Sequence, residues 1–149
     1  GTVRVIGQLG QGNREAIDAI RNILEQKHGK EHGDTLVAAA LAAGLLADKA
    51  AIPSLRRHLA GAYWPLKHNA ALALGKLGDK SVVQRMLSWL KAPFDENFRC
   101  YACEVLGDLQ DKAAAMHLKN ALAVEPVSWV RQKIEESLKR LQTVSHNEN

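Results

Sequence analysis

The chain has 149 residues, of which 46% are hydrophobic, 24% charged and 5% aromatic, and its formal net charge is +4. This composition is that of an ordinary folded chain and excludes wholesale disorder, and the length fits one domain or one compact array of repeats. Two cysteines exclude a disulfide scaffold and favour a reducing, cytoplasmic location, and the longest apolar run, residues 36–47, is shorter than the roughly 18 residues that a membrane span needs.

One short motif recurs at nearly constant spacing. Its copies occupy residues 43–49, 74–80 and 106–112, and each has a glycine at its second position. Gly75 lies 31 residues after Gly44, and Gly107 lies 32 residues after Gly75. Repetition at such a period is typical of solenoids, in which each unit buries its apolar face against its neighbours. The sequence therefore predicts an array of similar units.

Each unit is predicted to consist of two helices joined by a short turn. Apolar residues recur every three or four positions in both segments of a unit, which is the spacing of one face of a helix. The turn ends in an aspartate, which we expect to cap the second helix. These turn aspartates are Asp48, Asp79 and Asp111. In chain order the units cover about residues 1–28, 34–61, 64–92 and 95–124, with a half unit at 126–142 and a polar tail at 143–149.

The first unit departs from this pattern. Residues 6–10 match the motif, and residues 11–13 are predicted to form a slightly longer turn. The register places the start of its first helix before the first residue, so we expect a fragment, or a chain without an N-terminal cap or further repeats. In the polar link at 27–33, His28 and His32 have the spacing of metal ligands on a helix. Glycines interrupt that helix, so we interpret the segment as a solvated link.

Alternation with period two is absent, so the predicted fold class is all-α. We expect a right-handed α–α superhelix of about four and a half helix-pair repeats, forming a single domain over residues 1–142. The segment at 67–79 has a basic residue, an alanine three positions later and the sequence Leu-Gly-Lys-Leu-Gly-Asp. This pattern resembles the short HEAT-like repeats, including the type named after phycobilisome bilin lyases. The resemblance covers about residues 3–141 and is specific for fold, whereas such repeats serve many functions.

The resemblance also implies a ladder of ion pairs between units. It pairs the basic residues that fall in register, Lys67, Arg99 and Arg131, with the turn aspartates or related acids. Exposed pairs of this kind contribute only about 0 to 1 kcal/mol each. We therefore expect the ladder to hold the register of the repeats.

No catalytic residue, metal site or cofactor is predicted. Cys100 and Cys103 have the CxxC spacing of a redox or zinc pair, but no βαβ pattern surrounds them and no further zinc ligands stand at suitable spacing. We interpret both cysteines as small packing residues. The sequence contains no phosphate loop, HExxH or GxSxG motif, so the chain is expected to be non-catalytic.

The candidate binding surface is the concave face, which second helices line in solenoids of this kind. Trp89 lies at the edge of an apolar stripe, where it either anchors a partner or packs against the adjacent unit. Trp64 and Trp129 are expected to wedge between units. The predicted partner-binding residues are polar or mildly basic, with one aromatic: Asn22, Arg57, Arg85, Ser88, Trp89, His117 and Asn120.

The leading hypothesis is a non-catalytic scaffold that binds a protein or peptide on this face. Alanine substitutions of Arg57, Arg85 and Asn120 should then weaken binding and leave thermal stability nearly unchanged. Nucleic-acid binding is one alternative, since a charge of +4 permits it, but the basic residues do not form a continuous stripe. A bilin lyase-like enzyme is another, which rests on the resemblance alone.

Overall fold

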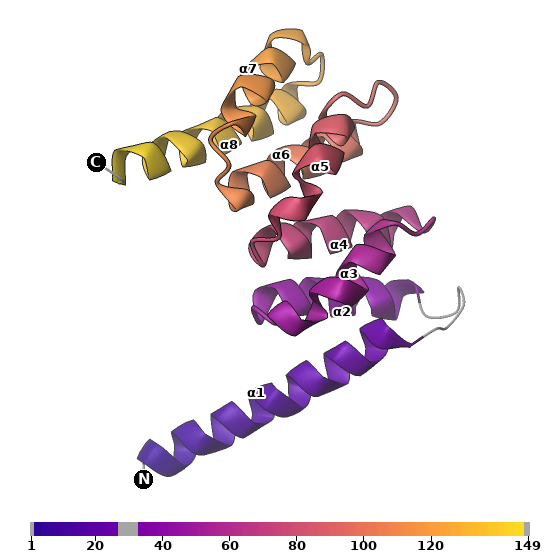
Figure 1. The fold of residues 1–149 in the computed structure, drawn as a ribbon, viewed down its shortest axis with the longest axis vertical. Coiled ribbons are helices and arrows are strands. Elements are labelled where there is room, and N and C mark those ends of the chain that lie inside the picture. The colour runs from indigo at the N-terminus through magenta and orange to yellow at the C-terminus, as the bar shows by residue number, and fades with distance from the viewer. Residues whose placement is uncertain (1, 27–32, 148–149) are drawn as a thin grey trace. The chain divides into compact units, whose positions relative to one another are not determined.

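The computed structural model describes the backbone of residues 2–26 and 33–147 and the side chains of residues 13–26 and 33–142 (Figure 1). Within these ranges the chain is helical and contains no strand, so the all-α prediction is confirmed. His28 and His32 lie outside the described residues. The chain divides into two compact units, residues 1–73 and 74–149, which are described separately below.

Unit 1 contains three complete helices and most of a fourth. A 3₁₀ turn, η2, precedes α3, and α1 packs against both α2 and α3. The division between the two units falls inside α4. The helices are α1 (Thr2–Glu25), α2 (Gly33–Leu45), α3 (Ile52–Leu59) and α4 (Trp64–Lys76), and η2 spans Lys49–Ala51.

The prediction of a turn at residues 11–13 is wrong, because α1 is one continuous helix of 24 residues. Gly12 and Asn13 are typical turn residues, but the segment contains no proline and can keep its backbone hydrogen bonds. Apolar residues also keep helical spacing across it, as Leu9, Ala16 and Ile20 show. The first predicted repeat is therefore one long helix, α1, and not a pair of helices.

Unit 2 contains the end of α4 and four further helices. Helix α5 packs against α6 and α7, and α8 packs against α6 and α7. Helix α8 continues to Asn147, so most of the predicted polar tail is helical. The helices are α5 (Val83–Leu90), which follows the 3₁₀ turn η3 (Lys80–Val82), then α6 (Glu96–Leu109), α7 (Ala114–Val124) and α8 (Ser128–Asn147).

The turn inside a helix pair has the same backbone conformation in all three copies. Ala47, Gly78 and Gln110 have φ angles of 55°, 76° and 55°, and each directly precedes a turn aspartate. This left-handed conformation commonly ends a helix, and glycine adopts it without steric strain. Only one of the three positions carries glycine, so the repeat imposes this conformation on alanine and glutamine.

Two of the three turn aspartates accept a backbone hydrogen bond in the turn that leads into the second helix. Asp79 caps η3, which precedes α5, whereas α5 and α7 themselves have no side-chain cap, so the predicted cap lies in the turn and not on the α-helix. The Asp79 carboxylate accepts a hydrogen bond from the backbone N–H of Ser81 at 3.2 Å, and Asp111 accepts one from Ala113 at 3.0 Å. Asp48 forms no side-chain cap. Its carboxylate instead accepts a 2.8 Å hydrogen bond from the guanidinium of Arg21, which ties η2 to α1.

Substitutions at the left-handed positions should have opposite signs. Gly78→Ala should lower the free energy of unfolding by about 1 kcal/mol, because a Cβ atom strains this conformation. Gln110→Gly should raise it by a similar or smaller amount, since glycine also gains freedom in the unfolded chain. Urea unfolding measures both values. Equal signs for the two variants would contradict a shared left-handed turn.

Candidate functional site

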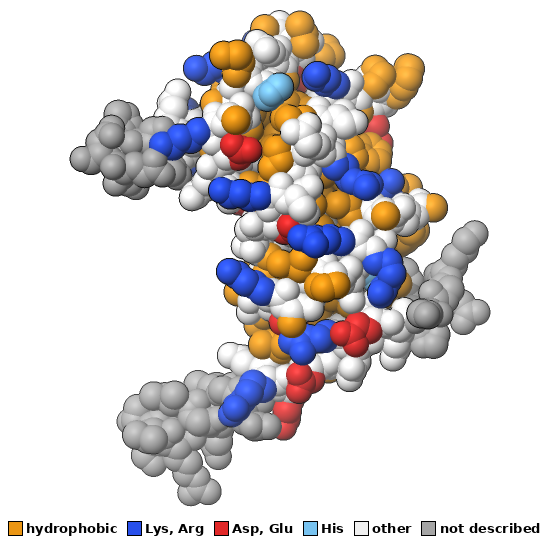
Figure 2. Space-filling model, viewed as in Figure 1, with side chains coloured by type: hydrophobic (Ala, Val, Ile, Leu, Met, Phe, Trp, Pro, Cys, Tyr) orange, Lys and Arg blue, Asp and Glu red, His pale blue; other side chains and the backbone are white. Residues whose placement is uncertain are grey.

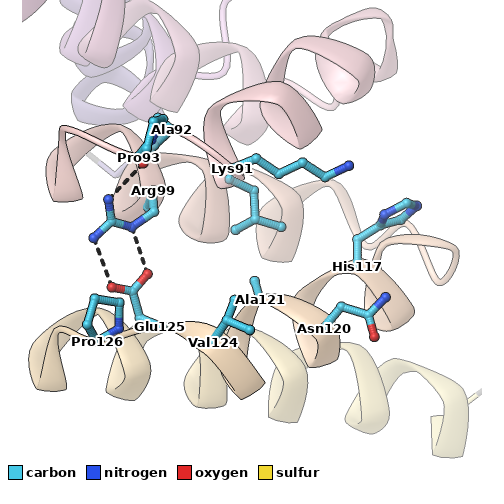
Figure 3. Close-up of a pocket in the computed structure, with 11 residues that line it drawn as sticks. Lys91, Ala92, Pro93, Arg99, His117, Asn120, Ala121, Val124, Glu125 and Pro126 are labelled. Carbon is cyan, nitrogen blue, oxygen red and sulfur yellow. Dashed lines mark hydrogen bonds and ion pairs between the residues drawn. The ribbon is translucent and has the colours of Figure 1, made fainter.

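Unit 2 contains an open pocket of about 540 Å³ between the end of α5 and α7 (Figure 3). Its volume is within the range of about 300–1,000 Å³ that is usual for ligand-binding pockets. The loops that follow α5 and α7 close its sides. It is lined by Leu90, Lys91, Ala92, Pro93, Arg99, His117, Asn120, Ala121, Val124, Glu125 and Pro126.

The middle of the pocket is apolar. Leu90, at the end of α5, is buried, whereas Val124, at the end of α7, has 79% of its surface exposed. Ala121 lies one turn before Val124 on the same helix, and its small side chain leaves room above it. The pocket therefore holds apolar surface that unit 2 itself does not cover.

One end of the pocket carries hydrogen-bond donors. His117 and Asn120 project from α7, and Lys91 extends toward the same end from the first position after α5 (Figure 3). All three residues are exposed. Within the described part of the chain, no ion pair or side-chain hydrogen bond engages any of them. These donors are available to a ligand.

The opposite end is closed by an ion pair of buried Glu125 with partly buried Arg99. Arg99 donates two hydrogen bonds to the Glu125 carboxylate, from Nε at 2.7 Å and from Nη2 at 2.9 Å (Figure 3). Its third nitrogen, Nη1, donates to the Ala92 carbonyl at 2.7 Å. The backbone N–H of Val127 donates to the same carboxylate at 3.1 Å. The pair thus connects α6 with the loops on both sides of the pocket.

Burial and hydrogen bonding act in opposite directions on the pKa of Glu125. Burial favours the neutral acid and raises the pKa, but the hydrogen bonds from Arg99 and the Val127 N–H, with the attraction of nearby Arg131, outweigh it. The pKa of Glu125 therefore lies below its ordinary value. The Arg99 guanidinium has its own pKa raised, chiefly by the hydrogen bond to Glu125. Both groups are charged at neutral pH.

Unit 2 also contains a ladder of ion pairs, but at a different position from the one predicted. The Asp108 carboxylate lies 3.9 Å from Lys76 Nζ and 2.6 Å from Arg140 Nη1. These three residues are spaced by 32 positions and occupy equivalent places on α4, α6 and α8. A Cβ atom at Gly107 would collide with the Arg140 guanidinium, so the glycine leaves the space that this side chain crosses.

The predicted pairing with turn aspartates is not found for Arg99, which pairs with another acid, the alternative that the prediction left open. Arg99 pairs with Glu125, and Arg131 donates a long 3.5 Å hydrogen bond to the carbonyl of the same residue. Asp48 pairs with Arg21. The Arg99 guanidinium lies between the Glu125 carboxylate in the α7–α8 loop and the Ala92 carbonyl in the loop after α5, and not beside a turn aspartate.

Comparison with known proteins decides the family. Residues 59–139, which are more than half of the chain, match the family described as HEAT repeats. This chain belongs to the HEAT-repeat family. Its resemblance to repeats of the bilin lyase type goes beyond this match and stays a prediction. No curated protein sequence matches the chain significantly.

A solved structure shares the fold of part of this HEAT-repeat chain. The chain is similar to the crystal structure of epoxyqueuosine reductase with a tRNA-Tyr epoxyqueuosine-modified tRNA stem loop, with a TM-score of 0.55 and 23% sequence identity. The similarity covers 59% of this chain and 28% of the reductase chain. At this identity the likeness concerns the fold alone.

Two of the seven residues predicted to bind a partner, His117 and Asn120, line the pocket. Arg85 and Ser88 are exposed on α5 but do not line it. Asn22 is exposed on α1 in unit 1. The prediction considered only the outward faces of helices, so the pocket residues that it named are both on α7.

Arg57, also in unit 1, has a structural contact that the prediction missed. Its Nη2 donates a 2.8 Å hydrogen bond to the Leu24 carbonyl, and His58 Nε2 lies 2.9 Å from the same oxygen. Both side chains thereby cap the end of α1, where helix carbonyls lack partners. Arg57→Ala should consequently cost about 1 kcal/mol of stability. The expectation of unchanged thermal stability is corrected for this residue.

The exposure of the tryptophans differs from that expected. Trp89, a candidate partner-binding residue, is buried, whereas Trp64 and Trp129, expected to pack between units, are exposed. Trp89 has 9% of its surface exposed and packs edge-on against Phe98, with ring centroids 4.8 Å apart. Its assignment as a partner-binding residue is therefore corrected in favour of packing. Trp64 and Trp129, expected to wedge between units, are 59% and 42% exposed.

The CxxC pair has the surroundings of packing residues. Cys103 is fully buried, and burial raises the pKa of its thiol to about 12. Burial also raises the pKa of Cys100, which is half-buried. Both thiols are protonated at neutral pH and are poor nucleophiles and metal ligands in that form. Among the described residues no cluster of three or more His, Cys, Asp or Glu side chains could hold a metal ion.

Lys91, Arg99 and Glu125 are pocket residues that the sequence did not assign to a binding site. Lys91 and Glu125 follow the ends of the second helices, so a search of helix faces omitted them. Pro126 offered a signal, since a proline ends the preceding helix and places Glu125 in a loop with extended backbone.

No described helix is both long enough and apolar enough to cross a membrane.

Removal of the Glu125 carboxylate should destabilise the chain strongly. Glu125→Gln leaves the partly buried Arg99 guanidinium without its counter-charge, which costs about 2 to 3 kcal/mol. Glu136→Gln is the matched control, because its ion pair with Lys133 is exposed and is worth about 1 kcal/mol at most. Urea unfolding at neutral pH should separate the two variants, and equal effects would contradict the geometry of the pair.

The same carboxylate should contribute to acid unfolding. Because folding lowers the pKa of Glu125, its contribution is complete above the unfolded pKa of about 4.3 and is lost as the pH falls through the folded value. The wild-type chain should lose more stability between pH 5 and acid conditions than Glu125→Gln does. A pH series of urea unfolding curves measures this difference, and parallel curves would contradict it.

Proposed function

We propose that this HEAT-repeat chain is a non-catalytic module that binds a protein or peptide through its second helices. The observation that carries the proposal is their charge. The segments 49–59, 80–90 and 114–124, which comprise η2–α3, η3–α5 and α7, contain three, two and one Lys or Arg residues and no Asp or Glu. The first helices α6 and α8, in contrast, contain five of each sign.

The surroundings of these charges support a binding role. On the part of the surface that α5 and α7 present in Figure 2, Lys and Arg side chains lie scattered among hydrophobic ones. Much of the charge on the first helices is used in ion pairs such as Arg140–Asp108. Arg85 and Lys119 of the second helices are exposed, and within the described residues they have no acidic partner. Unopposed positive charge steers an acidic partner to this surface.

The pocket favours a protein or peptide as the partner. Its middle is apolar, and an uncovered apolar surface with a few polar groups at its ends is typical of sites for side chains or small ligands. Single-stranded nucleic acids stack their bases on aromatic side chains, whereas the described residues that line this pocket include no Phe, Tyr or Trp. A cytoplasmic location stays part of the proposal.

Nucleic-acid binding is the second candidate, and the same unopposed charge supports it. The epoxyqueuosine reductase with a similar fold was crystallised with a tRNA stem loop. The two candidates differ in their salt dependence. Several phosphate contacts would make RNA affinity fall steeply between 50 and about 200 mM salt. A saturable RNA complex with that dependence would favour this candidate over the first.

Peptides selected against the wild-type chain should depend on the second helices. We expect a library of displayed random peptides to yield binders whose affinity falls at least about threefold in Arg85→Glu, because the reversal places a repulsive charge on α5. Lys133→Glu, a reversal at a half-exposed position on α8, should bind them within about twofold. Fluorescence anisotropy measures the affinities. A selection without binders, or equal loss in both variants, would contradict the proposed surface.

A further inference from the structure

We propose that the pocket of unit 2 holds an acidic partner segment in which an apolar side chain adjoins a carboxylate. This inference rests on the proposed protein-binding function and adds the site and the chemistry of its ligand. It follows from the order of groups along the pocket: donors at one end, apolar surface in the middle and a neutralised ion pair at the other end.

The apolar side chain of the ligand would lie in the middle of the pocket. Leu90, Ala121 and Val124 provide the contact surface there. Val124 is 79% exposed, so a ligand side chain placed against it would remove apolar area from water. The volume of about 540 Å³ accommodates one large aliphatic side chain together with the adjoining backbone.

The carboxylate of the ligand would lie at the end that holds Lys91, His117 and Asn120. An ammonium, an imidazole N–H and a side-chain amide can each donate a hydrogen bond to a carboxylate oxygen. His117 and Asn120 lie in the first two turns of α7, away from its carbonyl end. Figure 3 shows that Lys91 reaches toward these two side chains from the opposite wall. The three donors thus face one space.

The other charges of the pocket do not oppose a carboxylate at that end. Among the described residues that line the pocket, Glu125 is the one acidic residue, and it lies at the far end. Both of its oxygens accept hydrogen bonds from Arg99, so its charge is balanced. Each of the three Arg99 nitrogens donates to Glu125 or Ala92, and Glu125 balances the charge of the guanidinium. Lys91 is therefore the charge that selects an acidic segment.

The probe is a fluorescein-labelled peptide of about twelve residues, rich in serine and glycine, with one central leucine flanked by glutamates. Two control peptides carry glutamine in place of the glutamates or serine in place of the leucine. Anisotropy should show saturable binding of the probe, and each control peptide should bind at least about fivefold more weakly. An unstructured RNA of similar length tests the competing class of ligand.

Variants of the chain locate the site. Lys91→Gln removes the charge, and Ala121→Phe fills the apolar middle; each should weaken the probe by about five- to tenfold. Their matched controls are Lys133→Gln on α8 and Ala123→Phe on α7, two positions that do not line the pocket. Both controls should bind the probe within about twofold. Circular dichroism checks the helical content of every variant.

Several results would overturn the inference. Equal weakening by Lys91→Gln and Lys133→Gln would show diffuse attraction in place of a defined pocket. Equal binding of the probe and the glutamine control would exclude carboxylate recognition. If the RNA displaces the probe, and if Lys91→Gln and Ala121→Phe weaken RNA binding, the pocket is a nucleic-acid site. If the probe fails but peptides from the random library bind through α5, this pocket chemistry is wrong while the protein-binding function stands; if neither binds, both are wrong.

Discussion

The ion pair between Arg99 and Glu125 is the interaction on which the architecture of unit 2 depends. It joins α6 to the loop after α5 through Ala92 and to the loop after α7 through Val127. Each of these loops forms one wall of the pocket. Because the two charges satisfy each other in a site with little access to water, removal of either one alone is destabilising. The pocket keeps its shape for this reason, and its opposite end retains donors for a ligand.

The two kinds of helix use their charges differently. The first helices of unit 2 form ion pairs with each other. Asp108 on α6 pairs with Lys76 on α4 and with Arg140 on α8, at equivalent positions of the three helices. Second helices carry only positive charge, and Arg85 and Lys119 have no acidic partner among the described residues. The net charge of +4 therefore combines a structural part and a part that faces outward. The outward part supports the proposal of an acidic partner.

Helical periodicity and the repeated glycine–aspartate turn were sufficient to predict the all-α class and the polar role of Asp79 and Asp111 in the turns, because both are encoded within a few neighbouring residues. The left-handed positions Ala47 and Gln110 carry no such signal, since the turn imposes their conformation. The partner of Arg99 lies 26 residues away and is selected by packing. Likewise, register could indicate His117 and Asn120 but not the loop residues that complete their pocket.

An NMR titration of the ¹⁵N-labelled chain with the glutamate–leucine peptide tests the central claim most directly, because it reports every backbone amide at once. The account predicts that the largest shift changes fall on the loop after α5, beginning at Lys91, and along α7 from His117 to Val124. Saturation should follow a single binding curve. Largest changes on α6 and α8, or equal changes along α3, α5 and α7, would contradict a defined peptide pocket in this HEAT-repeat chain.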